Sequence, residues 1–157
     1  MEFADDGDMS EKIGRRRVTN SLLDEEFILR NLVQVAQALF YLHSRGILHR
    51  DIKTANLFLN KSGVLKLGDF GIARILEDNA DRVSARTCRT PVGTPLYMSP
   101  ELCTGASYGQ KADMWALGCV LYEVRSSPTT VVDEFRYFQT CHHCHFVIPP
   151  RCIYGVS

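Results

Sequence analysis

The sequence predicts one mostly α-helical domain in which short β-strands surround a single polar loop. Two stretches, 22–43 and 112–124, are rich in apolar residues and longer than ordinary strands, so they predict helices. Between them, the polar run His49–Asn56 is bounded on both sides by short apolar runs, and a further strand is expected over 64–67. A length of 157 residues suits one domain, because domains commonly have ~100–200 residues.

The first predicted helix runs from Asp8 to Arg17. Asp8 is a good N-cap, because its carboxylate can accept a hydrogen bond from a free backbone N–H group. The triplet Arg15–Arg17 falls at the C-terminal end, where the helix dipole favours cations. The triplet could also bind an acidic partner, but a solvated helix end is the simpler interpretation.

The second predicted helix, over 22–43, has the clearest pattern. Ser21 is its predicted N-cap, and Gly46 suits the left-handed residue that often ends a helix. We expect this helix to support the loop that follows it, not to take part in chemistry. One face is apolar at helical spacing and is predicted to pack on the core: Ile28, Leu32, Val35, Leu39 and Leu42.

The polar loop carries the three kinds of group that phosphoryl transfer needs. Asp51 could orient a hydroxyl group and take its proton, and Lys53 could neutralise charge on a moving phosphate. Asn56 could ligate a metal ion with its amide oxygen. The spacing of these residues makes the loop specific, whereas His-Arg-Asp alone would mean little.

Two further blocks follow this loop in order. The first is Asp69-Phe70-Gly71, and the second is Gly93-Thr94-Pro95-Leu96-Tyr97-Met98-Ser99-Pro100-Glu101. With the loop, they resemble the catalytic loop, the metal-binding triplet and the end of the activation segment of serine/threonine protein kinases. The sequences of 53–59, 67–74 and 92–102 resemble the NIMA-related group in particular.

This resemblance implies a partial protein-kinase fold over residues 1–124. It would comprise the hinge, helices D and E, the catalytic loop, the activation segment and the start of helix F. The Gly-rich lid, the strand lysine and the helix glutamate of the N-terminal lobe are not found. We therefore expect that lobe to be absent and this chain alone to have no appreciable activity. The alternatives are a non-catalytic binding fragment and a degenerate product without function.

The resemblance also implies roles for individual residues, with ATP and Mg²⁺ as cofactors. Asp51 would be the catalytic base, Lys53 would contact the γ-phosphate, and Thr94 would bond to both and mark specificity for Ser/Thr hydroxyls. Asn56 and Asp69 would ligate Mg²⁺, which prefers oxygen ligands. Six residues would support the site: His49, Arg50, Phe70, Gly71, Glu101 and Asp113.

Nucleotide binding and regulation follow from the same resemblance. Thr90 is the best phosphoacceptor in the activation segment, and its phosphate would pair with Arg50. The implied partners are a protein substrate with a Ser/Thr acceptor and a regulatory kinase. Four residues are expected to hold the nucleotide, through backbone groups, a carboxylate near the ribose and an aromatic floor under the adenine: Glu2, Ala4, Asp8 and Phe58.

Composition argues against several other classes of function. Lys plus Arg and Asp plus Glu both number 18, so zero net charge gives no electrostatic reason to expect binding to nucleic acid or membrane. The first residues lack the pattern of a signal peptide, and no apolar stretch is long enough to span a membrane. The six cysteines are then expected to be reduced thiols in a cytoplasmic protein.

The resemblance ends at Val124, and residues 125–157 are expected to form an irregular tail of atypical composition, rich in Cys and His. Our preferred interpretation of this tail is an altered reading frame or unspliced sequence. A zinc site is the alternative, because Cys-x2-Cys is a common half-site, although the second half is poorly spaced. Its four ligands would be Cys141, Cys144, His145 and Cys152.

Overall fold

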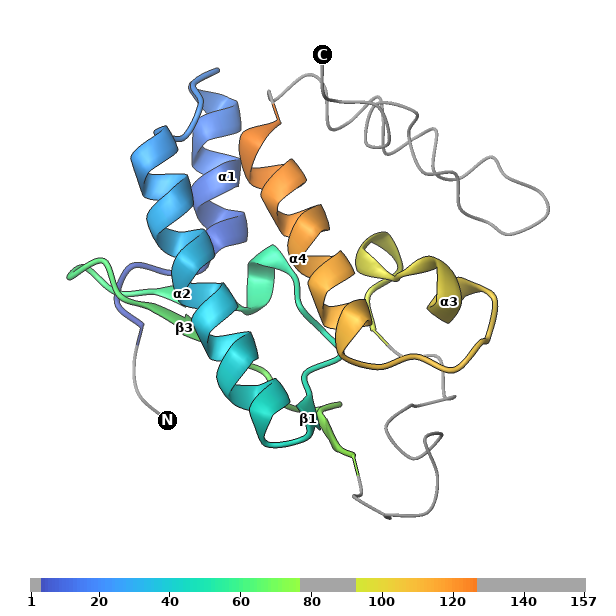
Figure 1. The fold of residues 1–157 in the computed structure, drawn as a ribbon. Helices are drawn as coiled ribbons and strands as arrows, with labels where there is room; N and C mark the ends of the chain where they lie inside the picture. The colour runs from blue at the N-terminus through green and yellow to red at the C-terminus, as the bar shows by residue number, and fades with distance from the viewer. Residues whose placement is uncertain (1–3, 77–92, 127–157) are drawn as a thin grey trace.

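The computed structural model describes residues 4–76 and 93–126. Helices α1, α2 and α4 lie side by side, and the short helix α3 lies on the other side of α4 from α2 (Figure 1). The helices are α1 Met9–Val18, α2 Glu25–Ser44, α3 Pro100–Cys103 and α4 Gln110–Arg125. The short elements are β1 Ile47–Leu48, β2 Leu57–Leu59, β3 Leu65–Leu67, β4 Arg74–Ile75 and two 3₁₀ turns, Thr54–Asn56 and Pro95–Tyr97.

Helix α1 begins where the sequence predicts. The Asp8 carboxylate accepts a hydrogen bond from the backbone N–H of Glu11 at 2.9 Å, so Asp8 is the N-cap. The segment before α1 runs beside β2. The N–H of Leu59 donates to the carbonyl of Gly7 at 2.8 Å, and Asp8 forms an antiparallel bridge with Phe58. This pairing fixes the N-terminal segment next to the strand that follows the polar loop.

Helix α2 begins at Glu25, later than predicted, and its N-cap is Asp24 and not Ser21. The Asp24 carboxylate accepts a hydrogen bond from the N–H of Phe27 at 3.2 Å. The Ser21 hydroxyl instead shares a hydrogen bond with the Thr19 hydroxyl at 2.8 Å. The prediction was wrong because the sequence offers two cap residues close together, and an anion gains more than a hydroxyl from the positive end of a helix.

The predicted apolar face of α2 packs on the core of the domain. Val35 and Leu39 are fully buried, and Leu32 is partly buried at the edge of the same cluster. The helix ends at Ser44, and Gly46 lies just past its end as predicted, with a φ of 69° in the left-handed region and an N–H that donates to the His43 carbonyl. The opposing core residues on α4 are Ala116, Leu117, Val120 and Val124.

An almost wholly apolar helix is expected to be buried on all sides, but α4 is not. Met114 is 50% exposed and Gly118 is also exposed, whereas Leu117 is buried. Helix α2 packs against one side of α4, and the turn Pro95–Tyr97 packs against another. No described element covers the side that carries Met114, so composition alone overestimates the burial of this helix.

Two small antiparallel sheets flank the polar loop. Strand β2 pairs with β3, with Leu57 opposite Leu67 and Leu59 opposite Leu65, and β3 is the strand expected over 64–67. Strand β1 pairs with β4, which brings the chain after the Asp69 triplet back to the start of the loop. A helical body with short strands around the loop is thus the fold class that the sequence predicts. Among the described helices, none is both long and apolar enough to cross a membrane.

The N-cap of α2 gives a first testable prediction. Replacing Asp24 with Ala should lower the free energy of unfolding by about 1 kcal/mol, because the N–H of Phe27 loses its acceptor. Replacing Ser21 with Ala should cost less than about 0.5 kcal/mol, as expected for an exposed site outside the cap. Urea unfolding of the two variants measures the difference, and an equal or larger loss for Ser21→Ala would contradict the assigned cap.

Candidate active site

The polar loop is bound by one buried carboxylate of α4. Asp113 is 2% exposed, and it accepts hydrogen bonds from the backbone N–H groups of His49 at 3.0 Å and Arg50 at 2.9 Å. Arg50 has a φ of 71°, in the left-handed region that non-glycine residues rarely adopt. Asp113 therefore holds the loop in its turned conformation through its contacts with the loop backbone, which suits the supporting role that the resemblance implies.

Helix α2 contributes a residue to this network that the sequence did not indicate. The ring Nε2 of His43 lies 2.8 Å from Asp113 Oδ2, and Gln110 donates to the His43 carbonyl at 3.0 Å. His43 thus joins α2, α4 and the loop. No local pattern signals this role, because the two partners are 70 positions apart in the sequence.

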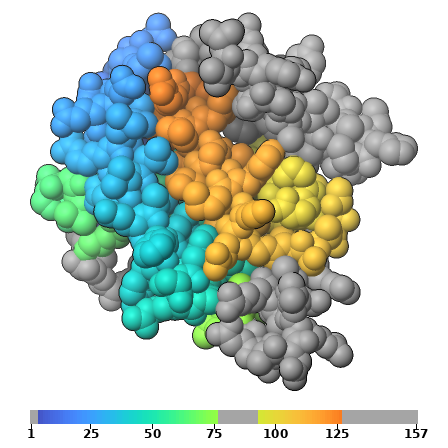
Figure 2. Space-filling model, in the orientation of Figure 1, coloured from blue at the N-terminus to red at the C-terminus, as the bar shows by residue number. Residues whose placement is uncertain are grey.

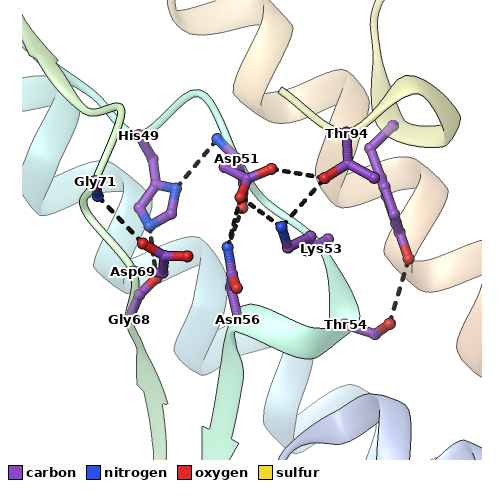
Figure 3. A network of polar contacts seen from close by, with 10 residues as sticks. His49, Asp51, Lys53, Thr54, Asn56, Gly68, Asp69, Gly71 and Thr94 are labelled. Carbon is purple, nitrogen blue, oxygen red and sulfur yellow. Dashed lines mark hydrogen bonds and ion pairs between the residues drawn. The ribbon is translucent and has the colours of Figure 1, made fainter. Parts of the chain in front are cut away.

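Asp51 lies at the centre of a polar cluster that contains the three residues predicted as catalytic (Figure 3). Thr94 Oγ1 donates to Asp51 Oδ1 at 2.9 Å, and Lys53 Nζ donates to Asp51 Oδ2 at 2.6 Å. Lys53 Nζ also lies 3.2 Å from Thr94 Oγ1. Asn56 Nδ2 donates to the same Oδ2 at 3.0 Å. Both carboxylate oxygens are therefore fixed by donors from two segments of the chain.

These donors decide the charge of Asp51. Burial alone would raise the pKa of the Asp51 carboxyl, but hydrogen bonds from Lys53, Thr94 and Asn56 outweigh it. The net effect is a pKa below the usual value. Asp51 is therefore an anion near neutral pH, which is the form that can accept a hydrogen bond from an incoming hydroxyl.

Thr94 reaches Asp51 because the residue before it is glycine. Gly93 has a φ of 119°, and a Cβ atom at this position would lie 2.8 Å from the Arg50 carbonyl oxygen. A side chain here would be both strained and in collision with backbone. The block from Gly93 to Glu101 is thereby brought against the loop, so the sequence order Gly-Thr has a direct geometric consequence.

Asn56 and Asp69 supply oxygen donors of the kind that Mg²⁺ prefers. The amide nitrogen of Asn56 also donates to the Asp51 carbonyl at 2.8 Å, which leaves Asn56 Oδ1 for a cation. Asp69 is exposed and has a φ of 59°. Its Oδ1 accepts a hydrogen bond from the N–H of Gly71 at 3.2 Å, which leaves Oδ2 for a cation. This donor set fits a metal ion that takes its other ligands from water and phosphate.

His49 is a buried packing residue with a defined tautomer. Its Nδ1 lies 3.4 Å from the N–H of Asp51 and its Nε2 lies 3.0 Å from the Gly68 carbonyl, so Nε2 is assigned the proton. Burial lowers the pKa of His49, which keeps the ring neutral. The ring also contacts Phe70, with centroids 4.9 Å apart and an interplanar angle of 59°. Both nitrogens are occupied, so a general-base role is not supported.

The residues predicted to hold the nucleotide are placed in part. Phe58 is half-buried on β2, and its neighbours Leu57 and Leu59 face the core, so its ring is on the opposite side of the strand. Asp8 is bridged to Phe58, and its carboxylate already caps α1. Ala4 is half-buried at the start of the described chain. Glu2, Thr90 and the zinc alternative at 141–152 lie outside the described residues.

Two support residues have surroundings that the sequence could not specify. The Arg50 guanidinium lies 5.7 Å from the centroid of the Tyr108 ring, so this cation has a partner without any phosphate. Glu101 is half-buried in the first turn of α3. Its carboxylate forms no hydrogen bond or ion pair within the described parts of the chain.

A second polar cluster beside the loop was not predicted. Glu123 of α4 accepts hydrogen bonds from the Tyr97 hydroxyl at 2.5 Å and from Thr54 Oγ1 at 3.1 Å. Burial, and then the Glu123 carboxylate, raise the pKa of Tyr97 above its usual value, so the phenol stays a donor. The cluster connects the loop, the turn after Thr94 and α4. Tyr97 lies in a recognised block, but nothing near Glu123 signals its role.

Known protein kinases resemble this chain over most of its length. A family model described as protein kinase domain matches residues 1–148. Serine/threonine-protein kinase Nek8 of Danio rerio is 51% identical over 127 residues, which cover 80% of this chain and 17% of that protein. Nek5 of Homo sapiens is 50% identical over 125 residues, or 79% of this chain and 17% of that protein. Nek1 of Mus musculus is 48% identical over 124 residues, or 79% of this chain and 10% of that protein.

The chain thus spans less than a fifth of the length of each of these relatives. All three are serine/threonine-protein kinases of the Nek group, which confirms the resemblance to NIMA-related kinases. Because the family model matches most of the sequence, the chain belongs to the protein kinase family.

Proposed function

We propose that this chain carries the phosphoryl-transfer site of a serine/threonine protein kinase that uses Mg-ATP. The observation that supports this most strongly is the cluster in which Thr94 and Lys53 donate to the two oxygens of Asp51, at 2.9 Å and 2.6 Å. An ionised carboxylate held between a hydroxyl and an ammonium group suits the orientation of an incoming alcohol.

The proposed reaction transfers the γ-phosphoryl group of ATP to a Ser or Thr hydroxyl of a protein. Asp51 would accept a hydrogen bond from that hydroxyl, align its oxygen with the phosphorus, and take its proton. The new oxygen–phosphorus bond forms as the bond to ADP breaks. Lys53 would neutralise charge on the phosphoryl oxygens, and Thr94 would keep the Asp51 carboxylate from rotating.

Nucleotide and metal would be held on the side of Asp51 that faces away from Thr94. Asn56 Oδ1 and Asp69 would ligate Mg²⁺, which neutralises negative charge on the phosphates when it is bound. The exposed side of the Phe58 ring would form the floor under the adenine. The remaining contacts would come from the hinge segment: Glu2, Ala4 and Asp8.

Regulation would act on the segment that leads to Gly93. We propose Thr90 as the site phosphorylated by a regulatory kinase, because a phosphate there adds about −1.5 to −2 charge and could pair with Arg50. Pairing would then compete with the contact between Arg50 and Tyr108. The substrate would be a protein with a Ser/Thr acceptor, and we propose that the reaction takes place in the cytoplasm.

The metal assignment gives a second prediction. Asp69→Ala should weaken Mg²⁺-dependent binding of ATP to the 157-residue chain at least about tenfold, because the cation loses a charged ligand. Glu25→Ala, which removes an exposed carboxylate from α2, should leave binding unchanged. Calorimetric titration with Mg-ATP, and with ATP in EDTA, measures both. No binding by a folded chain would contradict the proposal and favour the non-catalytic binding alternative.

The hydrogen bonds to Asp51 give a third prediction, on pH dependence. The folded-state pKa of Asp51 lies below its unfolded value of ~3.9. Ionised Asp51 therefore stabilises the fold fully above pH ~3.9, and this stabilisation is lost as the pH falls through the folded-state pKa. Thr94→Val removes one donor, so it should raise the pKa of Asp51. It should also lower the free energy of unfolding at pH 7 by about 1–2 kcal/mol, and by less at pH 2.

Carbon-13 NMR titration of the Asp carboxyl groups and urea unfolding at several pH values measure these effects. Thr104→Val is the matched control, because the Thr104 hydroxyl donates only to backbone carbonyls of α3. A Thr94→Val variant with an unchanged Asp51 titration would show that the Thr94 hydroxyl does not help to hold the carboxylate.

A further inference from the structure

A pocket at one end of the helical body contains two of the three residues of the arginine triplet. The C-terminal ends of α1 and α4 and the N-terminal end of α2 meet at this end, at the top of Figure 1. The pocket has an empty volume of about 230 Å³, part of it open to solvent. Its polar lining comes from Arg16, Arg17, Ser21 and Ser126, and it shares no residue with the Asp51 cluster.

The three arginines have different surroundings. Arg15 forms an ion pair with Glu11 at 3.4 Å on the same helix and does not line the pocket. Arg16 Nη1 lies 3.5 Å from Ser21 Oγ, a weak contact with a neutral group. Arg17 Nη2 is buried and has no hydrogen-bond partner in the described part of the chain. A buried guanidinium N–H without an acceptor costs free energy, so an acceptor in this pocket would be stabilising.

The charge around the pocket favours an anion. Its described lining contains two guanidinium groups and no carboxylate. Asp24 is close in sequence, but its carboxylate is bonded to the N–H of Phe27 as the cap of α2. The helix dipoles place roughly −0.5 charge at the C-terminal end of α1 and of α4. The two positive charges of Arg16 and Arg17 exceed this total. In the space-filling view, residues near the N-terminus, drawn in blue, adjoin the orange end of α4 near the top of the molecule (Figure 2).

We propose that this pocket binds a phosphate monoester group, held by the guanidinium groups of Arg16 and Arg17 and by the hydroxyl of Ser21. Arg presents N–H donors in a planar fork that matches the oxygens of a phosphate. The Ser21 hydroxyl, which shares a bond with Thr19, can turn its proton toward an anion. The phosphate would give Arg17 Nη2 its missing acceptor. The group could be inorganic phosphate or the side chain of a phosphorylated residue.

The test uses the 157-residue chain and its melting temperature in sodium phosphate, O-phosphoserine, serine or sodium chloride at equal ionic strength. Ligand that binds the folded chain raises this temperature with concentration. We expect phosphate or O-phosphoserine to raise it, and serine and chloride not to do so. Stabilisation by both phosphates would mean that the phosphate group suffices, and stabilisation by O-phosphoserine alone would identify a phosphorylated side chain.

Variants within the triplet locate the site. Arg17→Gln and Arg16→Gln should each weaken phosphate binding about tenfold or more, as expected from loss of a charged hydrogen-bond donor. Arg15→Gln, in the same triplet but outside the pocket, should bind as the unaltered chain does. Arg16 is exposed, so Arg16→Gln gives the answer even if Arg17→Gln does not fold.

Two results would overturn the proposal. The first is a melting temperature that responds to phosphate no more than to chloride, which would leave Arg17 as an unpaired residue at a helix end. The second is an equal loss of binding in Arg15→Gln and Arg16→Gln, which would indicate non-specific attraction of anions to the charge of α1.

Discussion

The buried carboxylate of Asp113 is the constraint on which the candidate site depends. A carboxylate with 2% exposure is costly unless it is well hydrogen-bonded, and here the N–H groups of His49 and Arg50 and the ring of His43 surround it. Its place in the first turn of α4 adds favourable interaction with the helix dipole. In turn, the two N–H contacts hold Arg50 in a left-handed conformation that costs about 1–3 kcal/mol.

The parts of the fold that the sequence predicts well are those set by neighbouring residues. Asp8 caps α1 and Gly46 ends α2 because capping depends on a few adjacent positions, and the apolar face of α2 follows from helical spacing. Tertiary surroundings decide the rest. The burial of Met114 depends on what packs beside α4, and the choice between Ser21 and Asp24 depends on where the chain enters α2.

The same division applies to the candidate site. Asp51, Lys53 and Thr94 could be predicted because they lie within recognisable blocks, and the structure brings them within hydrogen-bond distance. The contacts of His43 with Asp113 and of Thr54 with Glu123 link positions about seventy residues apart in the sequence, and no local pattern encodes them. The residues proposed as catalytic could therefore be named from the sequence, as could Asp113, whereas His43 and Glu123, which hold neighbouring segments in place, could not.

The hydrogen bonds to Asp51 limit the part that this residue can take in the proposed reaction. Its donors outweigh burial and lower its pKa, and a carboxylate with a low pKa is a weak base. Early removal of a proton from an alcohol would therefore be unfavourable. In a loose transition state for phosphoryl transfer, the alcohol becomes acidic only as its oxygen bonds to phosphorus. Asp51 would thus first orient the hydroxyl and accept the proton late. For this order of events, the rigidity of the carboxylate matters more than its basicity.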